Sequence, residues 1–236
     1  METINIHSVS GPNSLQNLKR TIVKRFILFV AIMAAMFFIP AGTINFWQAW
    51  VYLAVLTIPM VFVSIYFLRK DPELIDRRMR TKEKEDKQKN IMRWSTLYFL
   101  IAFLTPGFDF RFGWSSVPTE LIIIADVVVL LGYLLFFLVL KENSFASRVV
   151  EVEKNQKLIS TGPYAFVRHP MYSAVLIMYL LTPLALGSYI ALTLSLLLIF
   201  LIVARIRNEE KVLTKDLEGY NEYKQKVKYR IIPWVW

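Results

Sequence analysis

Long apolar blocks dominate this sequence and limit what it can fold into. Roughly 20 residues of helix are needed to cross the ~30 Å hydrocarbon layer of a bilayer, and several blocks approach that length. A soluble helical protein would instead alternate polar and apolar faces with a 3.6-residue period. Hydrophobic residues make up 56% of the 236 positions. The sequence therefore predicts an all-α, polytopic integral membrane protein.

The apolar blocks predict about six transmembrane helices and a cytosolic, amphipathic C-terminal helix. A turn at Gly187-Ser188 would separate the last two spans, since one uncharged stretch is too long for a single crossing. The C-terminal helix would carry an apolar stripe from Val212 to Val227. The expected spans are 26–43, 46–68, 94–108 and 121–140, followed by two that share 171–204.

The distribution of basic residues predicts the orientation. With the N-terminus inside and six spans, 27 of the 28 Lys and Arg residues fall on one side, and only Arg111 falls on the other. Cytoplasmic segments of membrane proteins carry this excess of positive charge. We therefore expect a multi-pass protein of the inner (cell) membrane with both termini and the active site on the cytoplasmic side.

Composition also excludes several kinds of chemistry. The chain has no cysteine and two histidines, His7 and His169, so we expect no disulfides, no thiol nucleophile and no metal site. The formal charge of +10 is explained by contact with anionic membrane lipids, and we expect no nucleic-acid partner.

Two charged features inside or beside the spans need an explanation. Asp126 lies within an expected span, where a carboxylate is costly and is often functional. A structural hydrogen bond to a neighbouring helix is the favoured interpretation, because Asp126 lies far from the expected cytoplasmic site. The basic loop 69–93 mixes both charge signs, and we expect a solvated helical connector that touches lipid headgroups.

The segment from Gln156 to Tyr172, QKLISTGPYAFVRHPMY, is unusual for a loop. Gly-Pro favours a turn, and Pro170 suits the first turn of the next helix, where no backbone N–H is needed. The start of that helix would then present unpaired N–H groups to a polar ligand at the cytoplasmic surface. An alternative is a basic interfacial anchor in which Arg168 and His169 reach lipid headgroups.

The second unusual segment, RIRNEEKVL, starts at Arg205, where the last span leaves the membrane. Arg205 and Glu209 are four residues apart and share one helix face. Considered alone, this pair would be a surface salt bridge that stabilises the fold by a few tenths of a kcal/mol.

Together, STGPYAFVRHPMY, a two-helix hairpin and RIRNEEKVLTKDLEGYNEYKQKVKYRIIPW resemble the isoprenylcysteine carboxyl methyltransferase family and its phospholipid methyltransferase relatives. INFWQAW and LRKDPELIDRRM also resemble prokaryotic members. The resemblance implies a four-helix membrane region with a basic cytoplasmic loop over 1–140. It implies a methyltransferase core over 141–236, formed by a cofactor-binding loop, the helix hairpin and the C-terminal helix.

The resemblance also implies S-adenosylmethionine as the cofactor and assigns residues to the site. Arg205 and Glu209 would be the catalytic pair, with Arg205 orienting the acceptor substrate and Glu209 bonding the cofactor. Two positions differ from the eukaryotic members, which carry a histidine at the position of Gln156 and a glutamine at that of Glu151. The cofactor would be bound by Gln156, Lys157, Leu158, Ile159, Tyr164, His169, Pro170, Met171, Tyr172 and Glu209.

The expected reaction moves a methyl group to the carboxylate of a lipophilic or lipidated acceptor drawn from the bilayer. A carboxylate is ionised at neutral pH, so an arginine that clamps it suffices and no base is required. One alternative is a phospholipid or other amine N-methyltransferase, in which Glu209 or Glu210 would act as base. A second alternative, a small transporter or structural membrane protein, is disfavoured because the polar motifs gather on one surface.

Overall fold

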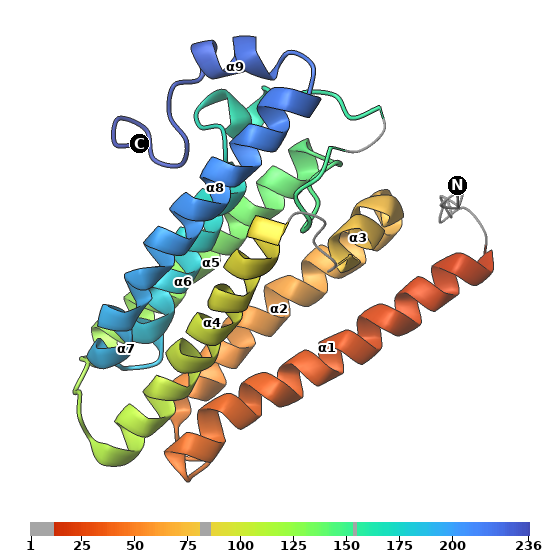
Figure 1. The fold of residues 1–236 in the computed structure, drawn as a ribbon. Coiled ribbons are helices and arrows are strands. Elements are labelled where there is room, and N and C mark those ends of the chain that lie inside the picture. The colour runs from red at the N-terminus through yellow and green to blue at the C-terminus, as the bar shows by residue number, and fades with distance from the viewer. Residues whose placement is uncertain (1–11, 81–85, 153–154) are drawn as a thin grey trace.

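The computed structural model describes residues 12–80, 86–152 and 155–236, and helices form the framework of these ranges (Figure 1). A single 3₁₀ turn, η1 (Gly162–Ala165), precedes the C-terminal hairpin. The α-helices are α1 (Pro12–Ala41), α2 (Trp47–Lys70), α3 (Pro72–Met79), α4 (Asp86–Phe112), α5 (Thr119–Glu142), α6 (Pro170–Ala185), α7 (Tyr189–Ser195), α8 (Leu197–Asp216) and α9 (Tyr220–Lys226).

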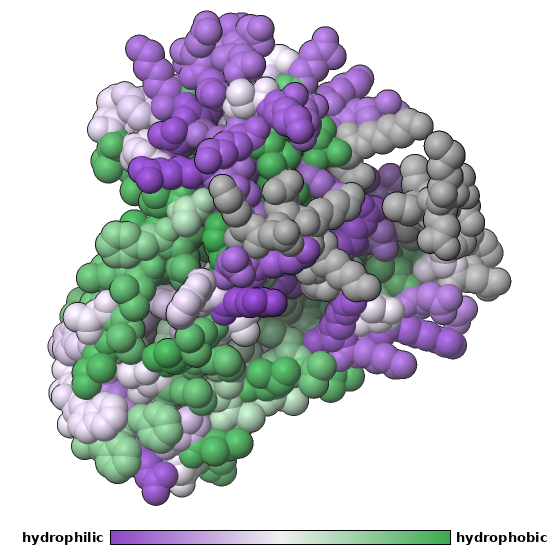
Figure 2. All heavy atoms as spheres, viewed as in Figure 1, coloured by the Kyte–Doolittle hydropathy of each residue, from purple (hydrophilic) through white to green (hydrophobic). Residues whose placement is uncertain are grey.

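The membrane-spanning helices match the fold expected from the sequence. Five described helices are long and apolar enough to cross a membrane: α1, α2, α4, α5 and the continuous α7–α8 segment, with α6 as a shorter apolar helix. The chain is thus an all-α, integral multi-pass membrane protein with about six spans. Hydrophilic residues gather at the end that carries α3 and α9, and hydrophobic residues cover much of the bundle below it (Figure 2).

Two helices are longer than expected, and the C-terminal helix is interrupted. Helix α1 begins at Pro12, ahead of the expected start at 26, and α4 extends over 27 residues, so the third span is not short. Helix α8 leaves the bundle and ends at Asp216, and Gly219 adopts φ +78° before α9 begins. Only glycine adopts such a backbone readily, so the expected amphipathic helix is divided in two.

The turn between the last two spans lies at Gly187-Ser188, as predicted. Gly187 has φ +74°, and the Ser188 side chain caps α7 by accepting from the Ala191 N–H at 3.0 Å. Ser188 also bonds Asp109 at the end of α4, and Asp109 accepts from the Ser115 N–H at 2.7 Å. These bonds connect α4 to the hairpin at the end of the bundle opposite α9 (Figure 1).

The hydrophobic core lies where α1, α2, α5 and α6 meet. Phe37, Tyr52 and Val129 are fully buried in it. Asp126 is buried nearby on α5, but neither of its carboxylate oxygens has a hydrogen-bond partner among the described residues. The interhelical hydrogen bond that we expected for Asp126 is therefore wrong for this part of the chain, because α5 faces mainly apolar neighbours there.

The basic loop after α2 is more structured than a solvated connector. Pro72 opens α3, and Asp71 caps it by accepting from the Leu74 N–H at 2.9 Å. Leu74 and Ile75 are buried against the bundle. The expectation of a solvated connector is thus wrong for α3, while residues 81–85 lie outside the described ranges. The burial of Leu74 and Ile75 fixes the position of the arginines that follow.

Candidate active site at the polar end of the bundle

A cavity of about 790 Å³ opens among α1, α2, α3, α4, α5, α6, α8 and the loop that precedes α6. Ten of the eleven residues that the sequence predicts for the site line this one cavity. They are Gln156, Lys157, Leu158, Ile159, Tyr164, His169, Met171, Tyr172, Arg205 and Glu209. Residues separated by up to 53 positions in the chain are therefore brought to one surface.

Pro170 is the eleventh residue, and it does not line the cavity. It is buried at the first position of α6, immediately after His169. Its ring fixes φ and needs no backbone hydrogen bond at that position, which starts the helix here. Pro170 therefore sets the direction of Met171 and Tyr172 and has no contact surface on the cavity.

Tyr172 joins the two residues that were expected to form the catalytic pair. Arg205 Nε donates to the Tyr172 hydroxyl at 2.8 Å, and that hydroxyl donates to Glu209 Oε2 at 2.6 Å. The other Glu209 oxygen lies 3.9 Å from His169 Nδ1. Charged partners shorten and strengthen such hydrogen bonds, so Tyr172 holds the two charged groups in a fixed relation.

The remaining donors of Arg205 point to other elements. Nη2 donates to the Arg148 carbonyl at 2.7 Å, and Nη1 lies 3.3 Å from Gln88 Oε1 and from Met92 Sδ. The Arg205 guanidinium therefore connects α8 to α4 and to the loop after α5. It is a structural junction as well as a cavity residue.

A second polar network lies directly behind the cavity and centres on Glu210. Arg168 Nε donates to Glu210 Oε1 at 2.8 Å, and Arg230 Nε donates to Glu210 Oε2 at 2.9 Å. His169 Nε2 lies 3.4 Å from Oε1 of the same carboxylate. Glu210, Arg168 and His169 are all buried, so this is a shielded network with two hydrogen-bonded charge pairs.

The same network holds the C-terminal segment against the start of α6. Arg168 Nη1 donates to the carbonyls of Val227 and Lys228 at 2.7 and 2.9 Å. The Arg168 and His169 N–H groups donate to the Tyr229 and Arg230 carbonyls at 2.9 and 2.8 Å. The alternative that Arg168 and His169 reach lipid headgroups is wrong, because backbone carbonyls and Glu210 already engage them inside the protein.

Tyr164 is held at the cavity wall by residues from two elements. Asn143 Nδ2 donates to its hydroxyl at 2.9 Å, and the Tyr223 hydroxyl donates to its carbonyl at 2.7 Å. Burial raises the pKa of Tyr164 to about 12, and burial also raises the pKa of Tyr223. Both phenols are therefore neutral hydrogen-bonding groups at physiological pH.

The cavity has an apolar part that extends between the membrane helices. Ile22, Phe26 and Phe29 of α1 line it together with Met60 and Val63 of α2. In Figure 1 the first half of α1 stands apart from the rest of the bundle on this side. One continuous cavity thus connects a polar wall to a surface suited to hydrocarbon chains.

Several residues of the site escaped the sequence analysis. Arg230 and Asn143 act through contacts that no local motif displays. Arg78 lines the cavity from the basic loop, where it was one of many arginines and lysines. One sequence signal could have indicated that Arg78 faces the bundle. After the Asp-Pro helix start, it shares a helix face with the apolar residues Leu74 and Ile75.

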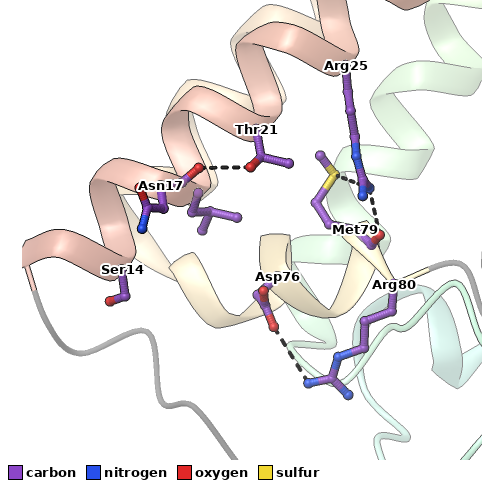
Figure 3. A pocket seen from close by; sticks show the side chains of 8 residues that line it. Ser14, Asn17, Thr21, Arg25, Asp76, Met79 and Arg80 are labelled. Carbon is purple, nitrogen blue, oxygen red and sulfur yellow. Dashed lines mark hydrogen bonds and ion pairs between the residues drawn. The ribbon is translucent and has the colours of Figure 1, made fainter.

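A smaller, more open pocket of about 540 Å³ lies between the start of α1 and α3 (Figure 3). Arg25 and Met79 line both this pocket and the main cavity, and Arg25 Nη1 donates to the Met79 carbonyl at 2.7 Å. Arg80 lies 3.7 Å from Asp76 at the pocket wall. The polar groups that line this smaller pocket largely bond one another. We therefore assign the chemistry to the main cavity.

Comparison with known proteins agrees with the resemblance noted from the motifs. Residues 121–215 match the family model described as the isoprenylcysteine carboxyl methyltransferase (ICMT) family. No curated protein sequence matches the chain. A solved eukaryotic intramembrane Ras methyltransferase, ICMT, is similar in structure with a TM-score of 0.56 and 18% identity, over 94% of this chain and 82% of that one. That likeness confirms the fold.

Proposed function

We propose that this chain, whose residues 121–215 match the isoprenylcysteine carboxyl methyltransferase family model, is an S-adenosylmethionine-dependent carboxyl methyltransferase. Its acceptor is a lipophilic molecule drawn from the bilayer. The observation that carries the proposal is the single cavity on which the predicted site residues converge, polar at one end and apolar at the other. The division into a membrane region over 1–140 and a core over 141–236 remains part of the proposal.

The residues present suit S-adenosylmethionine. The cavity volume falls within the roughly 300–1,000 Å³ of ordinary ligand sites. The Tyr220 hydroxyl lines the cavity and is buried without a hydrogen-bond partner among the described residues, so it can bond a polar ligand group. Glu209 supplies a carboxylate for the cationic donor, and Leu158 and Ile159 supply apolar contacts. Lys157 and the start of α6 at Met171 suit the donor's own carboxylate.

The chemistry requires positioning more than acid–base assistance. Bound S-adenosylmethionine would supply an activated methyl group on its sulfonium, and transfer of that methyl to the acceptor carboxylate oxygen would leave a neutral thioether. No proton moves in this step. The chain must therefore align the two groups and exclude water. Tyr172, held between Arg205 and Glu209, fixes the cavity wall at which the methyl donor and the acceptor carboxylate would meet.

Features of the site disfavour the amine-acceptor alternative. Such an acceptor must lose a proton, and Glu210 is occupied by Arg168 and Arg230 behind the cavity wall. Glu209 already accepts a hydrogen bond from Tyr172. Arginines and lysines also outnumber carboxylates along the cavity, which favours an anionic acceptor over a cationic one.

We also propose that the polar end of the bundle faces the cytoplasm of a cell (inner) membrane. The N-terminal end of α1 and the C-terminal segment both lie toward that end (Figure 1). The bias of 27 basic residues to one side supports this orientation. Reporter fusions at the two ends should both be active inside; an external C-terminal reporter would contradict it.

The direct test starts from purified protein in nanodiscs without added metal. Calorimetry with S-adenosylmethionine and S-adenosylhomocysteine should detect binding, and its absence in several detergents as well would overturn the proposal. Incubation with methyl-labelled cofactor and host lipid extract should then give a base-labile product, because esters hydrolyse. A base-stable product would instead support N-methylation.

A further inference from the structure

Helix α3 carries three arginines in its last turn and C-cap, and two of them are paired. Arg77 lies 3.9 Å from Asp71 and 3.6 Å from Glu73, and its Nε donates to the Ser144 carbonyl at 3.1 Å. Arg80 lies 3.7 Å from Asp76 and 3.5 Å from Glu151. These two arginines have an evident structural role.

Arg78 differs from both neighbours. It turns into the main cavity, and within the described ranges its guanidinium makes neither a hydrogen bond nor an ion pair with the protein. Among the described residues, the Arg78 guanidinium lies over the Phe136 ring, whose centroid is 5.1 Å from Cζ. A guanidinium offers five donors, and inside a protein such groups normally find an acceptor. Arg78 is therefore a half-buried cation whose hydrogen-bonding capacity is unused by the described residues.

The surroundings of Arg78 make an anionic ligand favourable. Burial lowers its pKa to about 10, and the charge of Arg148 adds to the lowering. Arg148 also lines the cavity, whereas the lining carboxylates Glu151 and Glu209 already engage Arg80 and Tyr172. An anion placed here would offset both the desolvation and the repulsion between the two arginines.

Arg78 also lies at the point where the polar and apolar parts of the cavity meet. It lines the same cavity as Tyr164 and Tyr172, which form the polar wall. Its guanidinium lies over the ring of Phe136, which lines the apolar part of the same cavity. A molecule with a carboxylate head and a hydrocarbon tail would place its head at this boundary.

We infer that Arg78 binds the carboxylate of the acceptor, and that the donors of Arg205 mainly hold the site together. This inference rests on the proposed function, and it reassigns the carboxylate clamp from Arg205 to α3. A guanidinium can bind both oxygens of a carboxylate in parallel, which would orient one oxygen toward the methyl donor. The tail would follow Phe136 toward α1.

The experiment measures binding of two probes to the full-length protein with S-adenosylhomocysteine present. One probe is N-acetyl-S-farnesylcysteine, and the other is its carboxamide, which keeps the shape but lacks the charge. The unmodified protein should prefer the carboxylate by roughly tenfold or more. Arg78→Gln should abolish that preference, and Arg78→Lys should restore only part of it because a point charge cannot form the paired contact.

The control is Arg69→Gln, which removes an exposed charge from the same end of the bundle. It should keep the preference. S-adenosylhomocysteine affinity should stay within about twofold in all variants. This second measurement separates the two proposals, because an unmodified protein that does not bind the cofactor product would overturn the proposed function. A preference that survives in Arg78→Gln, or is absent from the unmodified protein, would overturn the role of Arg78.

A third ligand distinguishes the source of the anion. Short-chain phosphatidic acid carries a phosphate and acyl tails, and it should compete weakly with the farnesylcysteine probe. Competition by the phosphate lipid alone, with no binding of the carboxylate probe, would contradict the assignment to a carboxylate acceptor.

Discussion

Two pairs of adjacent residues show how the chain divides its polar groups between chemistry and scaffold. On α8, Glu209 bonds Tyr172 at the cavity wall, while Glu210 bonds Arg168 and Arg230 behind it. On α6, Tyr172 faces the cavity, while the Ser173 hydroxyl donates to the Ile231 carbonyl at 2.6 Å. One residue is a rotation of about 100° on a helix, so neighbours point to different environments.

The difference teaches that the cavity wall is supported from behind by the C-terminal segment. The scaffold residues Glu210 and Ser173 bond the Arg230 side chain and the Ile231 carbonyl, whereas the cavity residues Tyr172 and Glu209 bond each other. The comparison predicts that scaffold changes reduce stability first, whereas cavity changes reduce binding or turnover first. Four substitutions test it.

The largest effect is expected for Glu210→Ala. It would leave Arg168 buried without its carboxylate partner, and breaking a buried pair costs about 3–5 kcal/mol. Thermal unfolding in detergent should show a large loss of stability, with Glu210→Gln less affected because it retains an acceptor. The exposed Glu218→Ala is the matched control. A Glu210→Ala protein that keeps its stability and loses only cofactor affinity would contradict the assignment of Glu210 to the scaffold.

The second effect concerns Glu209→Ala on the cavity side. Losing one charge-assisted hydrogen bond should weaken S-adenosylhomocysteine binding by roughly 1–3 kcal/mol, which is about 5- to 150-fold. Unfolding should change little, because Glu209 is only partly buried. Calorimetry and thermal unfolding of the same preparation give both quantities. Equal stability losses for Glu209→Ala and Glu210→Ala would mean that the two carboxylates belong to one structural network.

The fold was predictable in outline because membrane spans are encoded by local composition. Length, apolar runs and the bias of basic residues require no knowledge of distant contacts. The turn at Gly187 followed from local chemistry for the same reason. The start of α1 at Pro12 and the extent of α4 were not predictable, because polar extensions of a helix beyond the bilayer carry no hydrophobic signal.

The site was predictable where its cavity-lining residues lie close together within one sequence motif. The Gly-Pro-Tyr and Arg-His-Pro residues lie within one loop, so their order already indicates a common surface. The partners of Glu210 could not be inferred, since Arg168 and Arg230 reach it from segments 42 and 20 positions away. Arg78 is still more distant from the other site residues in sequence, and only the packing of Leu74 and Ile75 directs it toward the cavity.

The third effect concerns Tyr172→Phe. This change removes the hydroxyl that joins Arg205 to Glu209 while keeping the ring, so packing should be preserved. The two hydrogen bonds contribute about 1–3 kcal/mol together, and we expect turnover to fall roughly tenfold or more because the charged groups lose their fixed relation. Initial rates with labelled cofactor measure it. Unchanged rates would mean that this hydroxyl is only a packing feature.

The smallest effect is expected for Ser173→Ala, the neighbour of Tyr172 on the scaffold side. It removes one hydrogen bond to the Ile231 carbonyl, which contributes about 0.5–1.5 kcal/mol. For a chain of this length the melting temperature should fall by roughly 2–4 °C per kcal/mol, while cofactor affinity and turnover stay unchanged. Thermal unfolding and initial rates are compared with those of Tyr172→Phe. A loss of turnover in Ser173→Ala without a lower melting temperature would show that the C-terminal segment acts directly on the cavity.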